Sequence, residues 1–517
     1  MSISPFRRRR VVALARRRRR VRVAAIVVVL LVVVALAASL ATRARAEAAA
    51  AELRLSKSQG PPGSPVVVFG RGYQALETVD VYEDTTLWAT VQAHGTGAFS
   101  LHTKICSCFG PATIEVKGTG ESSGLSAQAP FTITTPWPQF RMTPEHTGDN
   151  RFENIISTFS ASAMLELWSG PTNNFFSYSS AVVSGGYAYV GSGDQNLYVF
   201  DAFGCGQQTV CPALWTGATG GYIDSTPAVA SNLVLVASTD AKLYAFPAQG
   251  CGQATCQPVW TATTGFAIHA SPTVAGKFVY LVSGDGLLHV YRAAGCGSST
   301  CQDVWTGTLN GLVPTGSSAA VSGGMVFVGA GDSVLAFAAN GCGQAQCSPL
   351  WATPTSGNVF SSPAVAGGVV YAGSEDHSLY ALDAATGAVL WTAPTGDVIE
   401  ASPAVRDGLV YVGSFDGGVY AFNASGCGQA TCGPVWDYGT KGPIFSSPSV
   451  ANDVLFVVSN DGYLRAFDAT GCGSLHCTPL RKWAVAGEGS PAVSDSQVLV
   501  ASQDGSLHTF GFPGLTG

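Results

Sequence analysis

The chain has 517 residues, a formal net charge of −6, 46% hydrophobic residues and only 12% charged residues. Its length exceeds that of one ordinary domain, and its apolar content excludes a largely disordered chain. After residue 46 it holds 33 acidic and 15 basic side chains, a charge of about −18. Because such a surface repels phosphates, nucleic acid is not an expected partner.

The first 46 residues predict a membrane-targeting segment, with 12 arginines and no acidic residue. Residues 1–22 form a basic segment that is expected to stay in the cytoplasm, and residues 42–51 form a linker. The uncharged, largely apolar run 23–41 can nearly span a bilayer, which predicts a single-pass cell-membrane protein with its bulk outside the cytoplasm. The alternative is a cleaved signal and a secreted protein, because small residues flank Arg45 in a cleavage-like pattern that ends at Ala46.

Residues 52–135 alternate short strand runs with turn clusters about every 8 to 12 residues, which predicts a β-sandwich. The sequences GPPG at 60–63, GRGY at 70–73 and GAFS at 97–100 resemble those of bacterial immunoglobulin-like modules of surface proteins. That resemblance implies a spacer or an adhesive unit. The sequence leaves open whether Cys106 and Cys108 pair with each other.

An internal repeat fills the remainder of the chain. Tryptophan recurs at intervals of 40 to 47 residues, and each interval contains four short strand runs and three tight turns. The repeat tryptophans are expected to pack between neighbouring units. They are Trp168, Trp215, Trp260, Trp305, Trp351, Trp391, Trp436 and Trp483.

Twelve cysteines form six local pairs within these repeats. The fifth repeat has only a cysteine-free turn at 383–387 in the same place, so the cysteines are expected to be structural disulfides. The alternative is a metal site, but zinc needs about four converging ligands and the hairpins should lie far apart. The expected pairs are Cys205/Cys211, Cys251/Cys256, Cys296/Cys301, Cys342/Cys347, Cys427/Cys432 and Cys472/Cys477.

The two ends of the repeat region are out of phase in a way that predicts a closed ring. A tryptophan strand at 164–168 lacks three preceding strands, and the last unit ends at 507–510 without a tryptophan strand. Pairing these two segments completes an eighth sheet and removes the open edge. We therefore expect an all-β chain whose residues 136–517 form an eight-bladed β-propeller of four-stranded blades.

Residues 136–517 resemble the quinoprotein-like eight-bladed propellers, the fold of pyrroloquinoline-quinone (PQQ) dehydrogenases and of the assembly lipoprotein BamB. The match is carried by WPQFR at 137–141, HTG at 146–148, YALD at 380–383, TG at 386–387 and LW at 390–391. Fold alone does not carry activity. The dehydrogenases have long inter-blade insertions that supply a calcium site and a catalytic acid, and they often have a disulfide of adjacent cysteines. The short repeats here leave little room for such insertions, and no Cys-Cys dipeptide occurs.

Functional residues are expected where the repeats differ, just before each innermost strand, at the rim of the central funnel. Aromatic and acidic groups that converge on a concavity form the default ligand-site hypothesis, against the alternative of a solvated channel mouth. The predicted function is a non-catalytic, extracytoplasmic binding or scaffold protein without a cofactor, whose partner is a cell-envelope protein, a glycan or a small ligand. A PQQ-dependent alcohol or sugar dehydrogenase is the alternative. The predicted rim residues are Tyr178, Tyr222, Asp224, His269, Phe360, Glu400, Phe445 and Glu488.

Overall fold

The computed structural model describes residues 50–174, 179–309 and 316–514. Their contacts divide the chain into two compact units. The first includes Pro65–Ile105 and Ile114–Phe131, and the second includes everything described from Thr132 onward. The regular secondary structure of the described residues is all β apart from a single helical turn, η1 (Ala161–Ala163), so the all-β prediction is confirmed.

The N-terminal strands form two sheets. Side chains alternate between buried and partly exposed along Thr78–Glu83, as expected for a sheet with one face toward a core. The resemblance of this region to immunoglobulin-like modules stays a prediction. One sheet has the order β1 (Glu52–Leu55), β3 (Pro65–Arg71), β6 (Phe99–Lys104), and the other has the order β2 (Gln59–Gly60), β8 (Ser126–Ile133), β7 (Ala112–Gly120), β4 (Thr78–Glu83), β5 (Thr86–Gln92).

The second unit contains eight sheets, called blades 1 to 8 here, each with four antiparallel strands in its described residues. Two-residue strands add a fifth member to four of the sheets. Blades 1 to 4 are β11 (Val182–Ser184), β12 (Tyr187–Gly191), β13 (Asn196–Asp201) and β14 (Trp215–Ala218); β15 (Ala228–Ala230), β16 (Leu233–Ser238), β17 (Lys242–Pro247) and β19 (Trp260–Thr263); β20 (Thr273–Ala275), β21 (Phe278–Ser283), β22 (Leu287–Arg292) and β24 (Trp305–Thr308); and β25 (Ala320–Ser322), β26 (Met325–Ala330), β27 (Ser333–Ala338) and β29 (Trp351–Pro354).

The remaining blades follow the same plan until the last, which combines the two ends of the repeat region. Blades 5 to 8 are β30 (Ala364–Ala366), β31 (Val369–Gly373), β32 (Ser378–Asp383) and β33 (Val389–Pro394); β34 (Ala404–Arg406), β35 (Leu409–Gly413), β36 (Gly418–Asn423) and β37 (Trp436–Gly439); β38 (Ser449–Ala451), β39 (Val454–Ser459), β40 (Tyr463–Asp468) and β41 (Arg481–Ala484); and β42 (Ala492–Ser494), β43 (Gln497–Ala501), β44 (Ser506–Gly511) and β10 (Leu165–Pro171). The added strands are β9 (Asp149–Asn150), β18 (Thr255–Cys256), β23 (Thr300–Cys301) and β28 (Gln346–Cys347).

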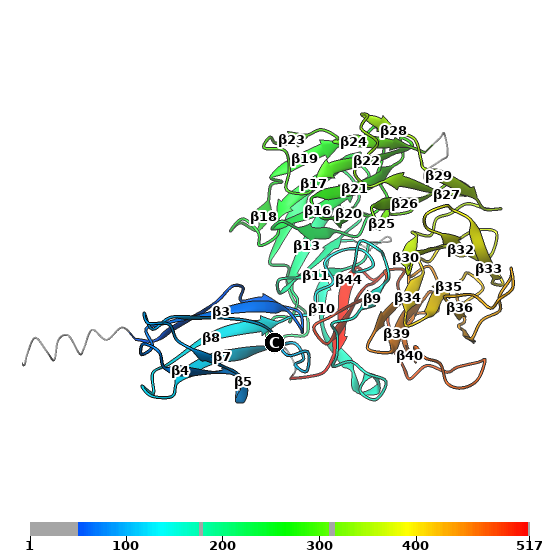
Figure 1. Cartoon of the computed structure of the whole chain (residues 1–517). Coiled ribbons are helices and arrows are strands. Elements are labelled where there is room, and N and C mark those ends of the chain that lie inside the picture. The colour runs from blue at the N-terminus through cyan, green and yellow to red at the C-terminus, as the bar shows by residue number, and fades with distance from the viewer. Residues whose placement is uncertain (1–49, 175–178, 310–315, 515–517) are drawn as a thin grey trace, which may run out of the picture. The chain divides into compact units, whose positions relative to one another are not determined.

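The eight sheets close into a ring. The innermost strand of each blade contacts that of the next, and β42 contacts β11 to complete the circle. β10 pairs antiparallel with β44, from Leu165 opposite Gly511 to Pro171 opposite Ser506, as the phase offset predicted (Figure 1). The pairing leaves no open sheet edge at the junction of the first and last repeats.

Each repeat tryptophan packs against the next blade. Trp215 is 5% exposed, and a Cβ atom on Gly250 of blade 2 would lie only 2.8 Å from its ring. Gly250 also has a φ of 79°, which disfavours a side chain there. The same contact links Trp168 to Gly204 and Trp436 to Gly471. The expected packing between units is therefore present, and the glycine before the first cysteine makes it possible.

All six predicted cysteine pairs are disulfides, and Cys106 bonds to Cys108. The disulfide hairpins also connect blades, because Thr255 and Cys256 of blade 2 pair with the outer strand β14 of blade 1. Blade 5, which lacks cysteines, still contacts blade 4 through a side chain, because Trp351 donates from Nε1 to the Ala384 carbonyl at 3.1 Å. Trp436 makes the same contact with Ala469 of blade 7, which has its disulfide. Each hairpin thus covers an edge that would otherwise be exposed.

The two cysteines of each repeat pair have different environments, which the prediction of the pairs did not address. The first cysteine is exposed or partly exposed, whereas the second is buried, with only 0 to 4% of its surface exposed. The reason is contact with the preceding blade. The Cys211 amide donates to the Ser169 carbonyl of β10 at 2.8 Å, and the amides of Cys432 and Cys477 donate to the outer strands of blades 5 and 6 at 2.8 and 2.9 Å. These residues are therefore part of the packing between blades and present no surface to a ligand. The buried members are Cys211, Cys256, Cys301, Cys347, Cys432 and Cys477.

An aspartate lies between the second and third strands of every blade. In seven blades, at positions 194, 240, 285, 376, 416, 461 and 504, its carboxylate contacts the side chain four residues later. In blade 5, Asp376 accepts a hydrogen bond from the Ser378 amide at 3.0 Å, and Tyr380 donates its hydroxyl to the same carboxylate at 2.6 Å. His289 takes the place of the tyrosine in blade 3, and Arg465 takes it in blade 7. These contacts tie each turn to the following strand.

The predicted location of the chain needs a correction. Across residues 50–174, 179–309 and 316–514, no helix is long and apolar enough to cross a membrane, so neither the single-pass location nor the membrane contact finds support. The expected spanning segment, residues 23–41, and the cleavage site near Ala46 lie outside the described residues.

Candidate functional site

A strap formed by residues 137–150 lies across the axis of the ring. It runs past the innermost strands in order and accepts a hydrogen bond from one valine amide in each of blades 2 to 7. The distances are 2.7 or 2.8 Å, and in all but one case the strap acceptor is a main-chain carbonyl. The donors are Val229, Val274, Val321, Val365, Val405 and Val450.

The strap is held from within by a buried arginine. The Arg141 guanidinium donates to the main-chain carbonyl oxygens of Pro403, at 2.9 Å, and Pro448. Burial lowers the pKa of Arg141 to about 9. Gly148 contacts this guanidinium so closely that a Cβ atom would overlap it, and its φ is 61°. The conformation of the strap therefore depends on Gly148.

A closed ring of hydroxyl groups surrounds the axis. In every blade, the amide of the serine or threonine before the innermost strand donates to the side-chain oxygen of its counterpart in the neighbouring blade, at 2.8 to 3.1 Å. In most blades this residue precedes a proline in the sequence, but the ring itself was not predicted. Its members are Ser180, Thr226, Ser271, Ser318, Ser362, Ser402, Ser447 and Ser490.

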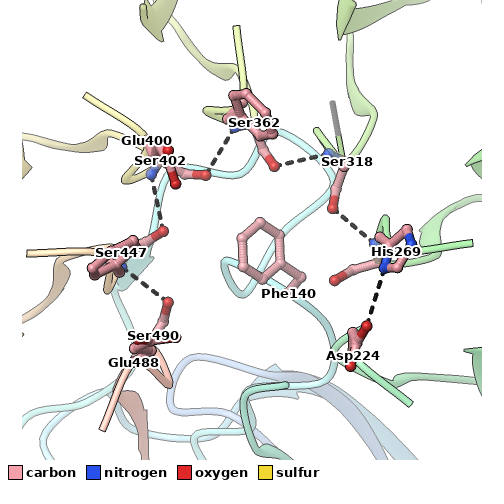
Figure 2. Close-up of a pocket in the computed structure, with 14 residues that line it drawn as sticks. Phe140, Asp224, His269, Ser318, Ser362, Glu400, Ser402, Ser447, Glu488 and Ser490 are labelled. Atoms are coloured by element: carbon pink, nitrogen blue, oxygen red, sulfur yellow. Dashed lines mark hydrogen bonds and ion pairs between the residues drawn. The ribbon is translucent and has the colours of Figure 1, made fainter. Parts of the chain in front are cut away.

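A cavity of about 500 Å³ opens above the hydroxyl ring, with Phe140 of the strap at its centre (Figure 2). Six of the eight predicted rim residues line it. Tyr222 is 56% exposed and does not line it, and Tyr178 lies outside the described residues. The predicted rim residues in the lining are Asp224, His269, Phe360, Glu400, Phe445 and Glu488.

The charged groups of the cavity have unequal environments. His269 Nδ1 lies 3.0 Å from Asp224 Oδ2, and this hydrogen bond raises the pKa of His269. Burial, together with repulsion from Glu375 and Glu488, raises the pKa of Glu400 to about 7. A carboxyl that titrates near neutrality marks an electrostatically strained position in a concave site.

The sequence matches the family model described as "Outer membrane protein assembly factor BamB" in three overlapping segments, residues 207–336, 296–429 and 398–511. The chain belongs to this family. No curated protein matches the sequence.

Solved structures agree with this fold. BamB from Moraxella catarrhalis has a TM-score of 0.52 and 14% identity, over 68% of this chain and 100% of that one. A europium-containing methanol dehydrogenase has a TM-score of 0.59 and 13% identity, over 73% and 98%. The quinohemoprotein alcohol dehydrogenase from Comamonas testosteroni has a TM-score of 0.57 and 14% identity, over 74% and 81%. The predicted PQQ-repeat propeller fold is confirmed, and at these identities the likeness concerns fold alone.

Proposed function

We propose that this chain is a non-catalytic binding or scaffold protein whose eight-bladed propeller recognises a protein, a glycan or a small ligand of the cell envelope. The observation that carries the proposal is the cavity on the ring axis, where acidic and aromatic side chains converge. Family membership supports a scaffold role, since the family is named for an assembly factor.

The seven disulfides support folding in an oxidising environment, where such bonds form and persist. They also support a rigid framework, because six of them fix hairpins at the outer edges of the blades. A rigid ring suits a binding face whose loops vary while the scaffold stays constant.

The alternative function is a PQQ-dependent dehydrogenase, which the quinoprotein neighbours favour by fold. PQQ carries three carboxylates and needs basic or donor groups to hold it. The described lining of the cavity instead contributes the carboxylates of Asp224, Glu400 and Glu488, and it includes no lysine or arginine. Its histidine is already paired with Asp224. The donor set therefore does not fit this cofactor, because like charges repel.

The test is a comparative binding screen with the full chain. Peptide, glycan and small-molecule libraries are screened against the wild type and against a variant with Asp224, His269, Glu400 and Glu488 changed to alanine. A matched control changes the exposed outer-edge residues Leu214, Val259 and Leu350 to alanine. We expect ligands that bind the wild type and the control but not the rim variant. A screen in which no binding depends on the rim would contradict the proposal.

A further inference from the structure

The two sides of the cavity differ in charge balance. On one side, Asp224 and His269 form an ion pair when the imidazole is protonated. On the opposite side lie Glu400 of blade 6 and Glu488 of blade 8, with Phe140 between the two sides (Figure 2). Within the described residues, neither glutamate forms an ion pair. The cavity therefore has one side whose carboxylate is paired with a histidine and one side whose carboxylates have no basic partner among the described residues.

A third carboxylate, that of Glu375, adds to the negative charge on this side of the cavity. Glu375 and Glu488 both raise the pKa of Glu400 by repulsion, after the larger effect of burial. Their own hydrogen bonds come from neutral amides: Asn358 Nδ2 donates to Glu375 at 2.7 Å, and Gln503 Nε2 donates to Glu488 at 3.1 Å. Glu400 accepts no hydrogen bond from the described residues. A positive charge would relieve this repulsion, and the described protein supplies none here.

Aromatic rings alternate with the two acids of the lining. Blades 5 to 8 place Phe360, Glu400, Phe445 and Glu488 at the rim in that order, and we call these four residues the acid–aromatic arc. The ring of Phe445 packs against that of Phe415, with ring centroids 4.1 Å apart. An aromatic face attracts a cation by its quadrupole, more strongly where water is partly excluded. Alternation thus gives one bound cation both carboxylate and aromatic contacts.

In the part of the chain that the structure describes, the base of the cavity offers an anion neither a free backbone donor of the hydroxyl ring nor a lysine or arginine. The ring amides at the strand starts, such as those of Ser402 and Ser447, already donate to neighbouring hydroxyl oxygens. No backbone donor of this ring therefore remains for a carboxylate or a phosphate. The hydroxyl oxygens can still accept from an N–H group, and Phe140 gives the centre an apolar floor. The base can thus accept hydrogen bonds from an ammonium group, while the preference for a cation comes from the carboxylates of the rim.

We propose that the acid–aromatic arc binds a protonated amine, carried by a small molecule or by an exposed lysine side chain of a partner. The ammonium group hydrogen-bonds to Glu400 and Glu488, and its alkyl or aryl portion packs against Phe360 and Phe445. This inference rests on the proposed binding function and names the chemical class of its ligand. It also explains why the chain tolerates three neighbouring carboxylates without a cation of its own.

The experiment is a calorimetric titration of the full chain at pH 8 with three probes of nearly equal shape. These are benzylamine, neutral benzyl alcohol and anionic benzoate; Nα-acetyl-lysine amide and calcium chloride are added in separate runs. The variant Glu400→Gln/Glu488→Gln removes both charges at nearly constant volume. Glu121→Gln, an exposed acid in the first unit, is the matched control. Thermal unfolding of each variant confirms that it is folded.

We expect saturable binding of benzylamine, little or none of benzoate, and a roughly ten- to hundredfold loss of affinity in the double variant, equivalent to one charge-assisted hydrogen bond. Binding of acetyl-lysine amide, in competition with benzylamine, assigns the amine to a partner's lysine, and its absence assigns a small molecule. Equal binding of benzoate, unchanged affinity in the double variant, or displacement of benzylamine by micromolar calcium would each overturn the inference. A neutral or anionic library ligand lost in the rim variant would overturn it while leaving the proposed binding function intact.

Discussion

Glu400→Gln should stabilise the protein above neutral pH. Burial and the repulsion from Glu375 and Glu488 raise the pKa of Glu400 from 4.5 to about 7. Between about pH 4.5 and 7, the Glu400 carboxyl is therefore mostly protonated in the folded state and mostly ionised in the unfolded state. Since the folded state binds more protons in that window, the free energy of unfolding falls as pH rises from about 4.5 to 7. Glutamine cannot ionise, so the variant lacks this loss.

The magnitude follows from the size of the pKa change. Each unit corresponds to about 1.4 kcal/mol, so the wild type should lose up to roughly 3 kcal/mol across the window relative to the variant. Glu400 is partly exposed, and solvent screening makes this an upper bound. The assay is chemical unfolding of wild type and variant at a series of pH values from 4 to 8.5, read as the difference between the two curves.

Two further variants test whether the pH dependence comes from Glu400 and its acidic neighbours. Glu488→Gln should move the wild-type decline to lower pH, because it removes one source of repulsion. Glu121→Gln should leave the pH dependence unchanged. If Glu400→Gln and the wild type follow parallel curves between pH 5 and 8, Glu400 behaves as an ordinary solvated carboxylate, and the charge imbalance inferred for the cavity is wrong.

Three further outcomes test the framework around the site. Gly148→Ala should lower the melting temperature markedly, because its Cβ would displace the Arg141 guanidinium from the strap; an unchanged melting temperature would contradict the role given to the strap. Changing Cys251 and Cys256 to serine should cost about 2 kcal/mol by the loop-entropy model, measured by denaturant unfolding with and without reductant. Burial lowers the pKa of His289, but hydrogen bonds to two aspartates outweigh it and raise the pKa to about 9. The contribution of His289 to the free energy of unfolding is therefore full below about pH 6.5 and is lost as pH rises through 9. His289→Tyr, which introduces the residue found in other blades, should flatten that decline in a pH series of unfolding curves, and an unaltered slope would refute this.

The repeat architecture could be predicted because its signals are local and recur. Each tryptophan, each hairpin and each turn aspartate appears once per blade, so seven or eight copies reinforce one interpretation. The phase offset between residues 164–168 and 507–510 even indicated which distant strands pair. These features depend on short-range periodicity, which sequence displays directly.

The features that the sequence did not reveal depend on the ring itself. The hydroxyl ring needs each serine to meet its counterpart some 40 to 47 residues away, or across the closure from Ser490 to Ser180. The path of the strap needs eight blades already in place. The repeated Ser-Pro step was a usable signal for the first, since one polar residue held at the same point in most blades indicates a shared contact. For the strap, the only signal in the sequence was that residues 137–150 do not follow the repeat pattern.

The cysteine pairs show the same division between local and ring-dependent features. Their short spacing predicted which cysteines bond, because a hairpin brings them together without help from the rest of the chain. The burial of the second member could not be predicted in this way. Cys211, Cys432 and Cys477 are buried because each lies against the outer strand of the preceding blade, a contact that exists only once the blades are assembled.

The rim residues were identified by a simple argument about variation between repeats, and six of them do line one cavity. Which of these side chains contact or repel one another could not be predicted in this way. Asp224 with His269, and Glu400 with its two acidic neighbours, depend on side-chain directions that a repeat alignment does not encode. That difference separates the side of the cavity whose carboxylate is paired with a histidine from the side that we propose binds an amine.

The most direct test of the central claim, a binding propeller rather than a quinone enzyme, is a calorimetric titration of the folded, oxidised full chain with PQQ, with and without calcium. We expect no saturable heat under either condition, because the carboxylates of the described cavity lining would repel a tricarboxylate. Saturable PQQ binding that disappears when Asp224, His269, Glu400 and Glu488 are changed to alanine, together with quinone-dependent dye reduction by an alcohol or a sugar, would contradict it.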